Sequence, residues 1–193
     1  LDCDDDDACT QDSCDPIDGC QNLAEPATSC VDTWAKGSLL VKEDVAGKER
    51  FLATLRDGPR LSLSDFGDPL LPTTGYTVCV YDDAKSLAGR LSVPPAVEKW
   101  KRVRDWRYVY RDQEAEADVI RALWLRRGGG KSRIVLSAAN DASKDQTSLP
   151  TGIAAALAGS TSATVQIHGS DAPACFSATL STVKDTGAFF KAR

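Results

Sequence analysis

The sequence predicts a mainly β protein: an antiparallel β-sandwich, jelly-roll or immunoglobulin-like, preceded by a small disulfide-braced module. The first thirty-two residues carry five of the seven cysteines and almost no large apolar side chains, so cross-links must hold them in place of a core. From residue 36 onward, segments with apolar residues at every second position are separated by Gly, Pro, Asp and Ser, as in half-buried antiparallel strands. We therefore divide the chain into an acidic module at 1–32 and a sandwich domain at 36–193.

Charge is distributed unevenly between these two parts. The acidic module holds ten acidic side chains and no lysine or arginine, whereas the remainder holds 23 bases and 18 acids. The module therefore carries a net charge of −10 and the sandwich domain +5, within a total of −5. Carboxylates at this density repel one another unless a cation or a basic surface compensates them.

The composition favours an exported protein. No apolar run approaches the ~20 residues of a membrane helix, so no membrane span is expected. The chain begins at Leu1 and lacks methionine, as expected after removal of a secretory signal. Its cysteines are spaced C-x5-C-x4-C-x5-C at the start, which indicates disulfides and differs from the paired C-x2-C of zinc sites. We expect an oxidising compartment, and hence an extracellular or cell-surface location.

The acidic module is predicted to be rich in loops. It contains Asp-Pro and Asp-Gly turn signals and shows no helical or strand period. The interleaved cysteines at its start suggest Cys3–Cys14 together with Cys9–Cys20, although four cysteines allow three pairings.

The module also resembles a known secreted repeat. Residues 3–20 read CDDDDACTQDSCDPIDGC, which is similar to the CDDG-x-x-CT-x-DSCDP-x-x-GC repeats of bacterial secreted and cell-surface proteins. It is similar, more loosely, to the aspartate-rich calcium repeats of thrombospondin type 3. The matching residues are Cys3, Asp4, Asp5, Asp7, Cys9, Thr10, Asp12, Ser13, Cys14, Asp15, Pro16, Gly19 and Cys20. Asp6 stands where the repeats have glycine. The rest of the chain, with segments such as YTVCVYDD and GGGKSRIVLSAAN, resembles a β-domain of no established activity that follows such repeats, so the resemblance implies an extracellular protein.

About eight to ten strands are predicted in the sandwich domain. They are expected at 38–43, 51–55, 61–63, 76–81, 87–93, 99–111, 119–126, 133–138, 163–168 and 175–180. A helix of two turns at most is expected at 151–158. The segment GGGKS at 128–132 lacks the first glycine of a phosphate-binding loop and is interpreted as a hairpin turn.

The sequence alone does not fix the partners of the remaining three cysteines, Cys30, Cys79 and Cys175. Alternation places Cys79 and Cys175 on the polar faces of their strands, so a bridge between them would lie outside the sandwich core, under the acidic module. It would contribute roughly 4–5 kcal/mol in the chain-entropy model; the alternative is two reduced, half-buried thiols. Because seven is odd, Cys30 is the expected leftover: free, bonded to Cys79 or Cys175, or bonded to another chain.

Calcium is the ligand predicted for the acidic module, because hard cations take six to eight oxygens and aspartate-dense loops supply them. The candidate ligands are Asp4, Asp6, Asp7, Asp12, Asp15 and Asp18. Two registers approach an EF-hand loop and neither is complete, so an irregular disulfide-braced loop is expected. The alternative is a solvated acidic surface that aids solubility or docks on basic residues.

Residues 99–111, KWKRVRDWRYVYR, interleave bases with aromatic side chains. In a single strand, Trp106, Tyr108 and Tyr110 fall on one face and could stack against sugar rings beside Arg107. One alternative is an edge strand whose aromatics pack on the sandwich and whose charges block unwanted pairing. Another is a strip that receives the acidic module of a neighbouring subunit. Nucleic acid is not expected as a partner of an acidic, cysteine-rich secreted chain.

The sequence marks no catalytic centre, and no enzymatic activity is expected. His168 is the single histidine, on the polar face of a predicted strand, and no serine or cysteine is marked as its nucleophile. The predicted function is structural: a secreted module that self-associates head to tail into an extracellular fibre or cell-surface component, stabilised by disulfides and calcium. The alternative is a carbohydrate-binding adhesion module that uses the aromatic-basic strand.

Overall fold

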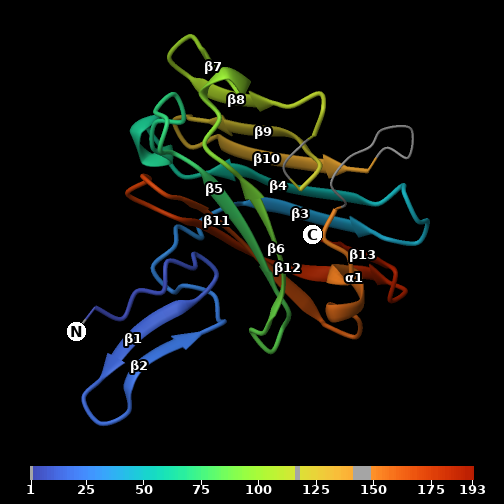
Figure 1. The fold of residues 1–193 in the computed structure, drawn as a ribbon. Coiled ribbons are helices and arrows are strands. Elements are labelled where there is room, and N and C mark those ends of the chain that lie inside the picture. Colours follow the sequence, from blue (N-terminus) through green and yellow to red (C-terminus); the bar gives the residue numbers. More distant parts are fainter. Residues whose placement is uncertain (1, 116–117, 141–148) are drawn as a thin grey trace.

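The protein is one long, curled antiparallel sheet with a two-stranded hairpin at its side (Figure 1). The computed structural model describes residues 2–115, 118–140 and 149–193. The hairpin strands are β1 (Gln11–Asp15) and β2 (Gly19–Leu23). The strands of the long sheet are β3 (Lys36–Lys42), β4 (Arg50–Gly58), β5 (Tyr76–Tyr81), β6 (Leu87–Val93), β7 (Trp100–Val103), β8 (Arg107–Arg111), β9 (Ile120–Arg126), β10 (Ser132–Ala139), β11 (Ser162–Gly169), β12 (Phe176–Asp185) and β13 (Phe189–Ala192). The helices are the single turns η1 (Ser64–Phe66), η2 (Val97–Lys99) and α1 (Ile153–Ala156).

The long sheet folds over itself and thereby encloses its own core. Its strands run in the order β6-β5-β11-β12-β13-β3-β4-β10-β9-β8-β7, and each neighbouring pair is antiparallel. In Figure 1, β5, β6 and β11 cross in front of β3, β4 and β10. Val78 of β5 and Leu39 of β3 accordingly belong to one buried cluster. The prediction of a mainly β, antiparallel fold with a disulfide-braced N-terminal module is confirmed, and the layers of the sandwich are two halves of one sheet.

Strand β5 separates two apolar clusters by simple alternation. Tyr76, Val78 and Val80 point into the main core, whereas Cys79 and Tyr81 belong to a smaller cluster on the opposite face. Successive side chains of a strand point to opposite faces of the sheet, so the predicted assignment of Cys79 to the side away from the core is confirmed. The smaller cluster lies beneath the acidic module, which explains why both faces of β5 are apolar.

The segment at 99–111 was predicted as one strand, and this prediction is wrong. It forms the antiparallel pair β7 and β8, in which Trp100 lies opposite Tyr110. The turn between the two strands holds Arg104 at a φ of 51°, a left-handed conformation that non-glycine residues adopt infrequently. Trp106 lies in the turn before β8 and, unlike Tyr108 and Tyr110, is not part of the core.

Other local predictions have mixed outcomes. The strand expected at 61–63 is wrong, because Leu61 forms an isolated bridge with Gly128 instead. Strands β1, β2 and β13 were not predicted. The hairpin turn at 128–132 is confirmed, since it joins the paired strands β9 and β10, and the short helix expected at 151–158 is confirmed by α1. No helix among the described residues has the length and apolar character needed to cross a membrane.

Candidate functional site

Two disulfides fasten the acidic module to the sheet. Cys9 is bonded to Cys79 of β5, and Cys30 is bonded to Cys175, just before β12. The predicted bonds Cys9–Cys20 and Cys79–Cys175 are therefore wrong. Cys30, the expected leftover, instead forms its bond with Cys175, which was one of the alternatives.

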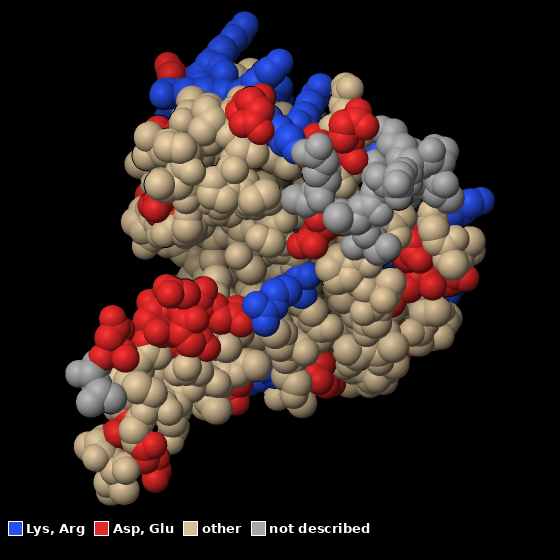
Figure 2. All heavy atoms as spheres, viewed as in Figure 1, with Lys and Arg blue, Asp and Glu red and all other residues tan. Residues whose placement is uncertain are grey.

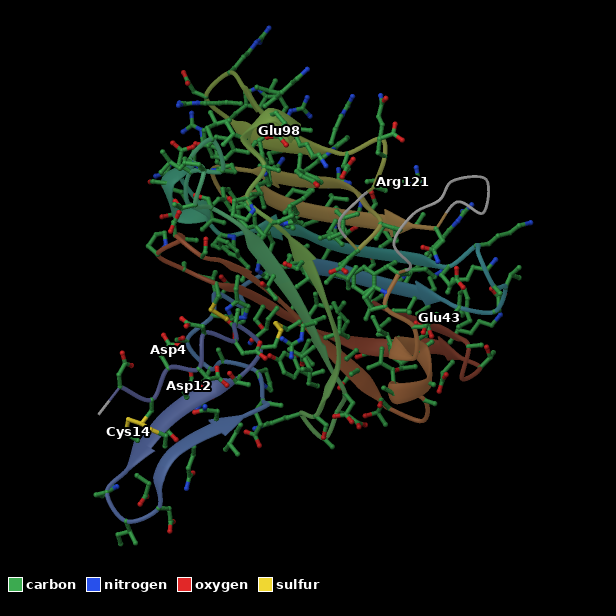
Figure 3. All side chains as sticks on the ribbon, viewed as in Figure 1. Asp4, Asp12, Cys14, Glu43, Glu98 and Arg121 are labelled. Atoms are coloured by element: carbon green, nitrogen blue, oxygen red, sulfur yellow. A yellow bond between two sulfur atoms is a disulfide. The ribbon has the colours of Figure 1, made fainter. Side chains whose placement is uncertain are left out.

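The odd cysteine belongs to a group of three. The sulfur of Cys3 lies within bonding distance of the sulfurs of both Cys14 and Cys20, which are directly opposite each other in the β1–β2 hairpin. A sulfur atom takes part in only one disulfide, so these three cysteines share a single bond. The predicted Cys3–Cys14 pair is one of the arrangements that this geometry allows. Figure 3 shows the bond at Cys14, on the side of the hairpin that faces the start of the chain.

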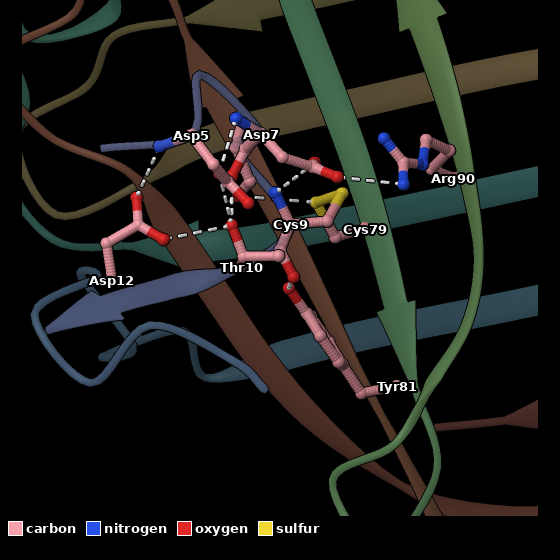
Figure 4. Close-up of polar contacts among 9 residues, drawn as sticks. Asp5, Asp7, Cys9, Thr10, Asp12, Cys79, Tyr81 and Arg90 are labelled. Atoms are coloured by element: carbon pink, nitrogen blue, oxygen red, sulfur yellow. Dashed lines mark hydrogen bonds and ion pairs between the residues drawn. A yellow bond between two sulfur atoms is a disulfide. The ribbon is translucent and has the colours of Figure 1, made fainter. Parts of the chain in front are cut away.

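Around Cys9, a small buried junction joins the module to β5 and β6 (Figure 4). The hydroxyl of Tyr81 donates a hydrogen bond of 2.9 Å to the carbonyl oxygen of Cys9. Burial, followed by the nearby Asp7 carboxylate, raises the pKa of Tyr81 to about 12. Asp7, a predicted metal ligand, forms an ion pair of 2.8 Å with Arg90 of β6. Its charge is therefore already compensated within the chain.

The end of the module is also bound to the sheet through its backbone. Val31 forms a parallel bridge with Phe176 of β12, in which the Val31 N–H donates to the Cys175 carbonyl and the Ser177 N–H donates to the Val31 carbonyl, both at 2.8 Å. Together with the disulfides, this bridge fixes the orientation of the module. Sequence reasoning missed it, because a two-residue contact leaves no periodic signal.

Three carboxylates meet in the loop before β1. One oxygen from each of Asp4, Asp5 and Asp12 lies within 4.8 Å of the others, and Figure 3 shows Asp4 and Asp12 on adjacent segments of the module. The backbone N–H of Asp7 and then the hydroxyl of Thr10 lower the pKa of Asp5, so this carboxylate remains ionised. We call Asp4, Asp5 and Asp12 the acidic loop. They are the residues that could hold calcium, and they would supply part of the six to eight oxygens it takes.

The other predicted calcium ligands lie elsewhere. Asp15 accepts hydrogen bonds from the backbone N–H groups of Ile17 and Asp18 at the tip of the β1–β2 hairpin, and these bonds lower its pKa. Asp6 donates its N–H to Asp4 and has a φ of 59°. The structure therefore brings together two of the six predicted ligands, and adds Asp5, which the sequence did not single out.

The proposed sugar platform is corrected by burial. Tyr108 is 4% exposed and Tyr110 is 0% exposed, and the Tyr110 ring lies 5.3 Å from the Trp100 ring inside the core. Both tyrosines stabilise the sandwich, as the alternative interpretation proposed. Only Trp106 lies outside the core, and the guanidinium groups of Arg107 and Arg126 lie over its ring at 4.5 and 5.2 Å. Its ring is therefore not an open surface for a sugar.

Instead of a sugar platform, the outer face of this part of the sheet carries a row of three arginines. Arg107 of β8 lies directly opposite Arg126 of β9, which lies directly opposite Arg133 of β10. Their neighbours along each strand, such as Tyr108 and Leu125, are in the core, so the arginines project outward. Sequence reasoning identified Arg107 and missed Arg126 and Arg133, because the row exists only once the strand register is known.

His168 lies beside the Cys30–Cys175 disulfide and is not on open surface. It is half-buried on β11, and its Nε2 lies 3.3 Å from the side-chain oxygen of Gln166. Burial lowers the pKa of His168, so the ring is neutral at pH 7. Its ring nitrogen lies within 4.8 Å of the sulfurs of Cys30 and Cys175, but those sulfurs are bonded to each other. A disulfide sulfur is neither the thiolate that zinc binds nor a nucleophile.

An open hollow of about 560 Å³ separates the acidic loop from the sheet. Asp4, Asp6 and Asp12 line one side of it, and Pro94 and His168 line the other. Figure 2 shows acidic side chains gathered over the module, and basic side chains gathered at the far end of the molecule near β7 and β8. The protein therefore has two ends of opposite charge. Comparison of the chain with protein-family models, with curated proteins and with solved structures finds no match.

Proposed function

We propose that this chain is a secreted structural module that assembles head to tail into an extracellular fibre or cell-surface component. The observation that supports this proposal most directly is the fixed separation of charge. The disulfides Cys9–Cys79 and Cys30–Cys175 hold the acidic module on β5 and β12, so its charge cannot fold back onto the basic end. A contact between unlike surfaces that does not close on itself propagates into a filament.

Two further features support an extracellular role. The anchoring bonds are buried or half-buried disulfides, which persist in oxidising compartments. The acidic loop offers carboxylate oxygens, the ligands that calcium prefers. Calcium bound there would stiffen the loop and reduce its negative charge, and would thereby weaken contacts that depend on that charge. The proposed role assigns no reaction to the chain.

The test is the state of association of the purified, oxidised chain. Analytical ultracentrifugation across a range of protein concentrations, at low salt and at 1 M NaCl, should show particles that grow with concentration at low salt. Because the Debye length falls from about 30 Å at 0.01 M to about 3 Å at 1 M salt, the same particles should dissociate at high salt. Negative-stain images of the low-salt sample should show linear objects. A monomer at every concentration and salt level, with and without calcium, would remove the proposal.

A further inference from the structure

Among the residues that the structure describes, none supplies a counter-charge to the arginine row. Arg107, Arg126 and Arg133 form no ion pair with any carboxylate of residues 2–115, 118–140 and 149–193. Like charges that lie directly opposite one another on neighbouring strands destabilise a sheet. The row therefore costs the isolated molecule stability, and a bound anion would remove that cost.

Three hydrogen-bond donors in and beside the row are buried and have no acceptor among the described residues. The Nε of Arg107, the Nε of Arg133 and the Nε1 of Trp124 are buried and unpartnered within the described part of the chain. Val109 and Val135 pair with Trp124 on the neighbouring strands, two residues along each strand from the arginines and on the same face. The row therefore has an apolar border. The outward-facing guanidinium charge on such a surface favours carboxylate, because the guanidinium fork matches its two oxygens.

The guanidinium groups are held in place rather than free to move. Arg107 lies over Trp106 at 4.5 Å and over Trp124 at 5.5 Å, and Arg126 lies over Trp106 at 5.2 Å. These cation–π contacts restrict the side chains before any partner arrives, which lowers the entropy lost on binding. Trp106 also borders an open hollow of about 640 Å³, whose charged lining consists of two further bases, Arg60 and Arg127, and one acid, Asp65. The basic surface therefore extends beyond the row itself.

The acidic loop is the complementary surface in the same sequence. Asp4, Asp5 and Asp12 crowd three carboxylates together and form no ion pair with a base of the described residues. The two surfaces lie in different halves of the sheet, because the module is fastened to β5 and β12 whereas the row lies on β8, β9 and β10, with β13, β3 and β4 between. Each surface carries the charge that the other lacks.

We propose that the arginine row is the docking surface for the acidic loop of a second copy of this chain. The guanidinium groups of Arg107, Arg126 and Arg133 bind the carboxylates of the acidic loop, and this contact is the repeating link of the assembly. The inference rests on the proposed function, since it names the partner surfaces for head-to-tail association. It makes calcium a competitor, because the ion and the arginines use the same carboxylates.

The experiment is a charge swap between two variants. Variant A carries Arg126→Glu and Arg133→Glu, so both of its docking surfaces are acidic. Variant B carries Asp4→Lys and Asp12→Lys, so both of its docking surfaces are basic. Each variant alone should begin to assemble only at a concentration about tenfold or more above that of the wild type, as expected for a lost and reversed charge contact. An equimolar mixture of A and B should assemble again, because the acidic row of A then receives the basic loop of B.

The mixture also shows that both variants are folded, because unfolded chains would not restore assembly. A matched control carries Lys85→Glu and Lys184→Glu, which reverse two exposed bases, one in the turn between β5 and β6 and one on β12, and it should assemble like the wild type. Millimolar calcium should raise the concentration at which the wild type assembles.

Two outcomes would overturn the docking surface. One is a variant A that assembles like the wild type; assembly would then be real and its contact would lie elsewhere. Another is a calcium-strengthened assembly, since the ion and the arginines would then not compete. If variant A assembles like the wild type and is no longer retained on a carboxylated polysaccharide column, the occupant of the row is a glycan. A wild-type chain that never assembles removes the proposed function together with this inference.

Discussion

The side-chain amide of Gln166 forms two reciprocal hydrogen bonds with the backbone of Ala27. The Ala27 N–H donates to Gln166 Oε1 at 2.9 Å, and Gln166 Nε2 donates to the Ala27 carbonyl at 2.7 Å. Gln166 is 1% exposed, so the amide acts like one residue of an added strand and seals the module against β11. The two residues are 139 positions apart in the sequence. Their contact explains why a polar side chain is buried on this face of β11.

The first prediction concerns this amide. Gln166→Ala should lower the free energy of unfolding by about 2 kcal/mol, because both backbone groups of Ala27 lose their partner. Gln166→Glu keeps the acceptor and loses the donor, so it should also destabilise the protein. Urea unfolding gives the free energies, and hydrogen exchange should show reduced protection of the Ala27 amide. Gln11→Ala, at an exposed position of β1, is the matched control and should change neither; equal effects of the two alanine variants would contradict the account.

The two anchoring disulfides should contribute unequally to stability. Cys9–Cys79 spans 70 positions and Cys30–Cys175 spans 145, which corresponds to about 4 and about 5 kcal/mol in the chain-entropy model. Replacing both cysteines of a pair by serine should therefore destabilise the protein more for Cys30–Cys175 than for Cys9–Cys79, as measured by guanidinium unfolding. Losses below about 1 kcal/mol would mean that the unfolded chain is not restrained by these bonds. Peptide mapping without reduction should recover both linked pairs.

The three cysteines of the hairpin should share one intramolecular bond. Alkylation of the unfolded, unreduced monomer should add a single label, because three sulfurs minus one disulfide leave one thiol. Mass spectrometry should place the label within the group Cys3, Cys14 and Cys20. A label on Cys9 or Cys30, or two labels on one chain, would disprove this assignment.

His168 should make the stability dependent on pH in a defined window. Its folded pKa lies below its ordinary value of 6.5 because burial disfavours the charged ring, so the unfolded chain takes up a proton first. The free energy of unfolding should consequently fall as the pH drops below 6.5, with a slope of at most about 1.4 kcal/mol per pH unit for one proton. His168→Asn should flatten this part of the profile.

A second loss of stability, at lower pH, comes from the protonation of two carboxylates and serves as an internal control. Hydrogen bonds from Thr161 to Asp83, and from Gly159 and Gly187 to Asp185, lower the pKa of both aspartates below 3.8. The stability that these groups contribute is present above pH 3.8 and is lost as the pH falls through their folded pKa values. The fall should be the same in the wild type and in His168→Asn. If His168→Asn kept the wild-type slope between pH 6.5 and 5, the fall in stability over that range could not be due to His168.

The local pattern of the sequence predicted the strands well and their partners poorly. Period-two alternation is a property of each strand, so the two faces of β5, with Val78 inside and Cys79 outside, could be read directly. Disulfide pairing depends on which strands lie together, and that information is not local. The alternation at Cys79 therefore predicted a bond beneath the module and could not select Cys9 as the partner.

The candidate site was harder to predict than the fold for the same reason. Trp106, Tyr108 and Tyr110 form one face only if the strand is continuous, and the turn at Arg104 has neither glycine nor proline to announce it. The arginine row depends on the register of β8, β9 and β10, in which Arg126 occupies the middle position. The acidic loop was partly foreseen, because its carboxylates are close in sequence, and the ion pair of Asp7 was not.

The covalent bond between Cys30 and Cys175 has a mechanical consequence. It closes a loop over 145 positions that includes strands β3 to β11, whereas β12 and β13 lie outside it. A pull applied on either side of these two cysteines therefore bypasses the loop. Only the segments outside it could be drawn out, at about 3.3 to 3.6 Å per residue, and the interior would remain wound until the sulfur–sulfur bond broke. Under a pulling force, a chain with this bond would lengthen by a short, defined distance and would then resist further extension.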